Sequence, residues 1–183
     1  ESDGAMIWSS LYVPELAGIQ IAADPAVYRG VVVAVGWRPR AVMPMFFVVG
    51  MSAETGEVLW LNHLHSGGSM MAYDNEQFLD LPTACGPPVI ADGVAYVTTG
   101  AGVVAAVDVL DGTTLWATAY PRARAINREE WAVRMATSRP PGIIAVFPDV
   151  VLFAPVDAHL LLAVERSTGR IRYMHTSVEL RAI

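Results

Sequence analysis

The stretch AVDVLDGTTLW, which runs from Ala106 to Trp116, decides the fold that this sequence encodes. Its first residues are apolar enough for a buried strand, and two aspartates then lead into Gly112. Aspartate side chains bond to local backbone, and glycine accepts a positive φ without steric cost. The stretch therefore predicts two strands joined by a tight turn, with Trp116 on the second strand.

The combination of a glycine, three residues and a large aromatic recurs along the chain. Successive glycines lie 52, 56 and 57 residues apart, in the pairs Gly4–Trp8, Gly56–Trp60, Gly112–Trp116 and Gly169–Tyr173. Near-constant spacing of four copies indicates an internal repeat. We expect each aromatic to be buried, and we expect Asp3, Asp108 and Glu165 to cap the turns that follow them.

Each repeat also contains a hairpin and a further strand before its glycine turn. The middle hairpin, Pro88–Val97, turns at Asp92-Gly93, which is a strong hairpin signal. Its counterparts are Pro25–Val33 and Ile143–Phe153, and the further strands are expected at 45–50, 103–107 and 159–164. Four short strands joined by tight turns are typical of a propeller blade. The nearly continuous apolar runs suit strands that are covered on both faces.

The repeats define one partial propeller domain over residues 1–183. Blade units are expected at 9–62, 84–118 and 141–175, with long loops at 63–83 and 119–140. The first unit has extra residues around Trp37–Ala41, which predict a long hairpin loop.

The middle unit, Ala106-x-Asp108-x-x-Asp111-Gly112-x-x-x-Trp116, resembles the tryptophan-docking motif of PQQ-like (quinoprotein-type) β-propeller repeats. The first unit departs from the motif with Gly50 and Ser52, and the third has Tyr173 in place of tryptophan. The resemblance implies an all-β fold of about three four-stranded blades, a partial ring of a seven- or eight-bladed propeller.

In that family each docking aromatic packs against the neighbouring blade. The residues to which the resemblance assigns this structural docking role are Gly4, Trp8, Gly56, Trp60, Ala106, Asp108, Gly112, Trp116, Ala163, Gly169 and Tyr173. These residues hold blades together, so they carry no chemistry.

Charge and hydropathy restrict the partners. The net charge is −6, with 12 basic and 18 acidic residues, which argues against nucleic acid because phosphate binding needs a basic surface. No apolar run reaches the ~18 residues of a membrane-spanning helix. We expect a protein partner, and we expect the remaining blades to come from the same chain or from an oligomer.

The family resemblance leaves three functions open. The chain looks most like BamB-like non-enzymatic propellers, which implies a non-catalytic protein-binding scaffold in the bacterial cell envelope, outside the cytoplasm. The alternatives are a fragment of a PQQ-dependent alcohol or sugar dehydrogenase and the sensor propeller of a signalling kinase. PQQ and calcium belong only to the dehydrogenase, which often has an adjacent-cysteine disulfide. This chain has one cysteine, Cys85, and no residue that we match to a calcium ligand or catalytic aspartate, so no catalytic, cofactor-binding or metal-binding residue is assigned.

Two groups of residues remain as candidates. His63 and His65 share one face of a regular strand and could reach one metal ion, with Asp74 or Glu76 as a third ligand; the alternative is two polar residues where a strand enters a loop. In the second long loop, Trp131, Arg124 and Arg128 are possible partner contacts, because loops carry function and tryptophan is enriched at binding hot spots. The alternatives are arginines in a solvated loop and a tryptophan that packs against the blade. We expect Cys85 to be buried or in a loop and not to act as a nucleophile.

Overall fold

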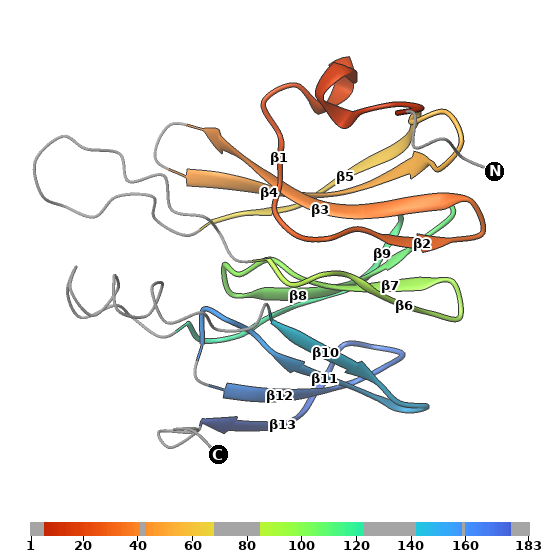
Figure 1. The fold of residues 1–183 in the computed structure, drawn as a ribbon. Coiled ribbons are helices and arrows are strands. Elements are labelled where there is room, and N and C mark those ends of the chain that lie inside the picture. Colours follow the sequence, from red (N-terminus) through yellow and green to blue (C-terminus); the bar gives the residue numbers. More distant parts are fainter. Residues whose placement is uncertain (1–5, 41–42, 68–84, 123–141, 159, 177–183) are drawn as a thin grey trace, which may run out of the picture.

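Three antiparallel sheets, here called blades A, B and C, follow one another along the molecule (Figure 1). The computed structural model describes residues 6–40, 43–67, 85–122, 142–158 and 160–176. Blade A contains β2 (Ala26–Tyr28), β3 (Val31–Arg40), β4 (Met43–Ser52) and β5 (Val58–Ser66), with the short β1 (Gln20–Ile21) also paired to β3. Blade B contains β6 (Val89–Ala91), β7 (Val94–Thr98), β8 (Val103–Asp108) and β9 (Thr114–Ala119). Blade C contains β10 (Ile143–Val146), β11 (Val150–Ala154), β12 (Leu160–Glu165) and β13 (Ile171–Thr176).

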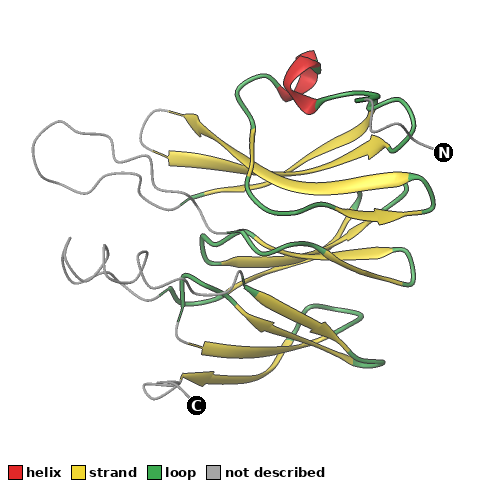
Figure 2. Cartoon of the chain, in the orientation of Figure 1, coloured by secondary structure: helices red, strands yellow, loops and turns green. Residues whose placement is uncertain are grey.

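Strands account for almost all regular structure in the described residues (Figure 2). Two short 3-10 turns, Ser10–Tyr12 and Pro14–Leu16, precede blade A. The predicted all-β fold with four-stranded blades is therefore confirmed. Within the described part of the chain, no helix is long and apolar enough to cross a membrane.

The first hairpin of blades A and B turns at residues in the left-handed region. Asp92 and Gly93 have φ values of 53° and 79°, and Arg29 and Gly30 have values of 47° and 80°. Positive φ at both central residues matches the right-handed twist of the flanking strands. The turn predicted at Asp92-Gly93 is confirmed.

The hydrophobic core lies between the blades. Alternate residues of β3 point to opposite faces of the sheet: Val33 and Val35 pack with residues of blade B, whereas Val32 and Ala34 pack with Leu16. Figure 1 shows the turns of residues 10–16 over the face of blade A that points away from blade B. Both faces of blade A are thus covered, as its continuous apolar strands require.

The long loop expected around Trp37–Ala41 is wrong for the part that the structure describes. Residues 37–40 continue β3 and pair with β4 as far as Arg40 opposite Met43. Trp37 is only 3% exposed and, with Phe46 opposite it, belongs to the core between blades A and B. Burial of these two rings holds the extra residues in a longer hairpin.

Candidate functional site: the seams between blades

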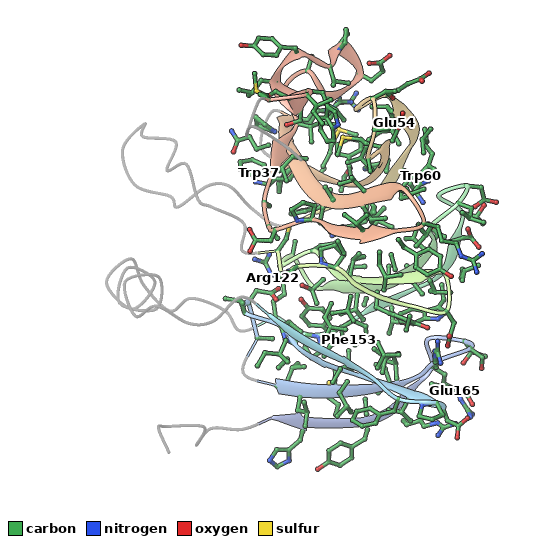
Figure 3. All side chains as sticks on the ribbon, turned by 45° about the vertical axis from the view of Figure 1, so that its right-hand side comes forward. Trp37, Glu54, Trp60, Arg122, Phe153 and Glu165 are labelled. Carbon is green, nitrogen blue, oxygen red and sulfur yellow. The ribbon has the colours of Figure 1, made fainter. Side chains whose placement is uncertain are left out.

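Each tryptophan of the repeat reaches into the next blade, and not into its own. The indole nitrogen of Trp8 donates to the carbonyl of Ala53 at 3.0 Å. Those of Trp60 and Trp116 donate to Val109 and Arg166, both at 2.9 Å. In every case the acceptor lies three residues before a turn glycine. Figure 3 labels Trp60 at the seam between blades A and B.

The turn glycines receive the faces of these rings. Gly56, Gly112 and Gly169 have φ values of 75°, 76° and 71°, and a Cβ atom at each would lie 2.6 Å from the ring of Trp8, Trp60 and Trp116, respectively. Glycine is therefore needed for two reasons, the backbone conformation and the space for the ring.

The residue opposite each aromatic on the preceding strand is small. Gly50 pairs with Trp60, Ala106 with Trp116 and Ala163 with Tyr173. A Cβ at Gly50 would overlap the Trp60 ring, which explains why the first repeat has glycine where the family motif has alanine.

Polar side chains form hydrogen bonds within the turns that precede the glycines. Asp108 accepts a hydrogen bond from the backbone of Leu110 at 2.7 Å, and Glu165 accepts one from the hydroxyl of Thr168 at 2.7 Å. The backbone N–H of Thr113 lowers the pKa of Asp111, and the Thr168 hydroxyl, with help from Arg172, lowers that of Glu165. Asp3 and Gly4 lie outside the described residues.

The expected burial of the aromatic is confirmed for Trp116, is partial for Trp8 and Trp60, and is wrong at Tyr173. Trp116 is 8% exposed, whereas Tyr173 is 56% exposed and stacks on His175 with ring centroids 6.2 Å apart. The equivalent of His175 in blade B is Thr118, whose hydroxyl donates to the carbonyl of Gly169 at 2.6 Å. Within the described part of the chain, no blade lies beyond Tyr173 to receive it.

The expectation that His63 and His65 share one face is also wrong. The register of β4 and β5 shifts between Phe46, which pairs with His65, and Phe47, which pairs with His63. The rings follow this pairing, because His65 stacks on Phe46 and His63 lies against Phe47. Neighbouring residues of β4 point to opposite faces, so this β-bulge separates the two imidazoles. Burial lowers the pKa of His65.

In the described residues, no three His, Cys, Asp or Glu side chains lie close enough together to hold one metal ion. The suggested third ligands, Asp74 and Glu76, lie outside the described residues, as do the possible partner contacts Trp131, Arg124 and Arg128.

A polar network links blades B and C near the labelled Arg122 (Figure 3). The Tyr120 hydroxyl donates to Asp157 at 2.6 Å, and Arg122 Nε donates to the other carboxylate oxygen at 3.1 Å.

Cys85 is 2% exposed and donates to the Thr99 carbonyl at 3.2 Å. Burial, reinforced by Asp157, raises the pKa of the Cys85 thiol to about 12, so little reactive thiolate is present at neutral pH.

A cavity of about 420 Å³ opens between blades B and C, and most of the charged side chains that line it are paired within the chain. Arg166 Nε donates to the Tyr96 hydroxyl at 2.8 Å, and its Nη2 donates to Asp92 at 2.6 Å. Glu165 accepts from Arg172 at 3.1 Å. Sequence reasoning missed Arg166. The available signal was an arginine at a repeat position where the other blades have Ala53 and Val109.

Comparison with known proteins found solved structures similar to this chain. The crystal structure of BamB from Moraxella catarrhalis superposes with a TM-score of 0.52 at 18% identity, covering 85% of this chain and 37% of that one. The quinohemoprotein alcohol dehydrogenase from Comamonas testosteroni gives a TM-score of 0.43 at 11% identity, covering 86% of this chain and 35% of that one. The chain thus spans well under half the length of either structure. No curated protein matches the sequence.

A family model described as outer membrane protein assembly factor BamB matches residues 1–172. That match includes Trp8, both seams between the described blades, and the strands of the three blades up to the start of β13. The chain therefore belongs to the BamB-like family of PQQ-type propeller repeats.

Proposed function

We propose that this chain is part of a non-catalytic propeller that binds protein partners in the bacterial cell envelope. Membership of a family described as an outer membrane protein assembly factor supports the location and the scaffold role. The three motif tryptophans and the glycines that receive them are engaged in contacts between blades, which leaves partner binding to other parts of the surface.

The observation that carries the proposal is the apolar surface along the last strands of blades A and B. Leu59 and Leu61 on β5 are 49% and 39% exposed, and Leu115 on β9 is 51% exposed. β5 and β9 each form one end of their sheet, so each has an edge that pairs with no strand among the described residues. Such an edge accepts an added strand through main-chain hydrogen bonds, and flanking apolar side chains provide selectivity.

Site-specific photo-cross-linking in cells tests this proposal. A photoreactive residue at Leu59 or Leu61 of the full protein, expressed in its native host, should give a discrete adduct with one envelope protein, identified by mass spectrometry. Leu110 is the matched control, because it is an equally apolar residue, 61% exposed, that lies in the turn before Gly112 and not on an edge strand. Absence of an adduct, or the same adduct from Leu110, would contradict binding at the edge.

Two further measurements test the other parts of the proposal. Cell fractionation should recover the protein with the envelope, and recovery in the cytoplasm would contradict the location. Addition of PQQ and calcium to the full protein should produce no alcohol- or sugar-dependent dye reduction. Turnover in that assay would contradict the non-catalytic scaffold role and support a PQQ-dependent dehydrogenase.

A further inference from the structure

The position three residues before each turn glycine differs chemically between the two complete seams. In both seams its carbonyl accepts the docking tryptophan, from Val109 in one and Arg166 in the other. Val109 is fully buried and lies in the same apolar core as Val33 of blade A. Arg166 instead carries a charge into the seam between blades B and C.

Tyr96 of blade B takes the place that Val33 has in blade A. Val33 pairs with Gly50, which pairs with Trp60, and Tyr96 pairs with Ala106, which pairs with Trp116. The two residues therefore occupy the same register position beside the docking tryptophan. One presents only methyl groups to the next blade, and the other presents a hydroxyl.

Arg166 satisfies that hydroxyl and a carboxylate together. Tyr96 is 1% exposed, and its hydroxyl lies 2.8 Å from Arg166 Nε. The guanidinium carbon also lies 5.9 Å from the Tyr96 ring centroid, and Nη2 lies 2.6 Å from Asp92 in the hairpin turn of blade B. A buried hydroxyl that loses its partner is costly, so this face of blade B favours an arginine.

Blade A carries the opposite charge at the same turn. Its hairpin has Arg29 before Gly30, where blade B has Asp92 before Gly93. If blade C docked on blade A instead of blade B, Arg166 would face the apolar Val33 and the like charge of Arg29. Conversely, Val109 docked on blade B would leave the Tyr96 hydroxyl without its arginine. Each face thus disfavours the partner of the other.

We propose that Asp92 and Tyr96 form a recognition site for Arg166, and that this polar contact makes blade B selective for blade C as its neighbour. Similar blades in one chain can dock in the wrong order or exchange between copies. The tryptophan and glycine contacts recur in every seam and cannot discriminate, so discrimination falls to the residues that differ.

Charge exchange at this contact tests the proposal, with chemical unfolding of the 183-residue chain at low salt as the readout and with Tyr173→Arg in every variant to limit association. Asp92→Arg copies the turn of blade A, and we expect it to lower the folding equilibrium constant about two- to fivefold more than Asp92→Ala, as is usual for partly exposed charge pairs. Arg166→Asp should cost less in the Asp92→Arg background than in the natural chain, because a pair of opposite charges forms again, and 1 M salt should remove this difference. Arg29→Asp is the matched control, because Val109 across its seam is apolar; we expect a change of about twofold or less.

Tyr96→Phe provides a second measurement that removes one oxygen and keeps the ring. We expect about a tenfold loss in the folding equilibrium constant when Arg166 is present, and a clearly smaller loss in an Arg166→Met background. Equal losses in the two backgrounds would overturn the proposal. So would Asp92→Arg behaving like Asp92→Ala, or Arg166→Asp costing as much in the Asp92→Arg background as in the natural chain.

Discussion

The docking geometry predicts that Gly112→Ala destabilises the chain much more than the same change at another left-handed glycine. Gly112 has φ 76°, and an added Cβ would lie 2.6 Å from two ring atoms of Trp60. Gly30 has φ 80° but has no atom within 4 Å of an added Cβ. The two substitutions therefore share a backbone penalty, and only one of them displaces a tryptophan.

The difference between the two variants can be estimated from these contacts. The left-handed conformation costs an alanine about 1–2 kcal/mol at either site. At Gly112 the ring must also move, which removes the hydrogen bond from Trp60 to Val109, worth about 1 kcal/mol. Loss of part of the ring's burial adds about another 1 kcal/mol. We therefore expect about 3–4 kcal/mol for Gly112→Ala and about 1–2 kcal/mol for Gly30→Ala.

Urea unfolding followed by circular dichroism and tryptophan fluorescence measures both values, with Tyr173→Arg in every variant to limit association. The test becomes sharper in a Trp60→Ala background, where the clash is absent and Gly112→Ala should cost no more than Gly30→Ala. Equal destabilisation by the two glycine variants in the natural background would refute the reasoning, because the close approach of Trp60 would then carry no energy.

Three more predictions follow from burial and charge. Cys85 should resist iodoacetamide in the folded chain at pH 8, since burial raises its pKa to about 12, and should react on unfolding; rapid labelling of the native protein, detected by mass, would contradict its burial. In the folded chain the pKa values of Asp111 and Glu165 lie below their ordinary values of 3.8 and 4.5, so their stabilising contribution is present above those values and is lost as pH falls through the lower folded values. Glu165→Gln should therefore make the free energy of unfolding less dependent on pH in acid, and an unchanged pH dependence would count against this coupling. The outer face of blade C exposes Leu161 (36%) and Tyr173 (56%), so the 183-residue chain should associate or aggregate in light scattering, and Tyr173→Arg should reduce this association. A clean monomer of 19.7 kDa would disprove the prediction.

Local turn chemistry made the blades predictable from the sequence. Asp92-Gly93 turns as expected because few residue pairs accept positive φ in succession, and the glycines at 56, 112 and 169 sit in left-handed turns for the same reason. The Trp37–Ala41 loop was not predictable from local rules. Its residues remain in β3 because Trp37 is buried against blade B, a contact made by tertiary packing.

The histidine pair shows a different limit of sequence reasoning. The rule that residues i and i+2 share a face assumes an uninterrupted ladder, and the bulge between His63 and His65 breaks it. Nothing in the sequence of residues 62–66, Asn-His-Leu-His-Ser, predicts a bulge. Its effect is large, because one shifted residue moves an imidazole to the other face of the sheet and removes a metal-binding pair.

The seams explain why the repeat motif predicts the fold well and the function poorly. The motif reads Gly-x-x-x-Trp within one repeat, but the hydrogen bond of Trp60 reaches Val109, 49 residues away in the next one. The shared residues are thereby committed to contacts inside the chain. Among the described residues, candidates for what distinguishes this protein are positions that differ between its own blades, such as Arg166 where blade B has Val109. Edge residues such as Leu59 and Leu61 of β5 are further candidates. In this fold, residues that differ between repeats are therefore better candidates for partner binding than the residues of the common motif.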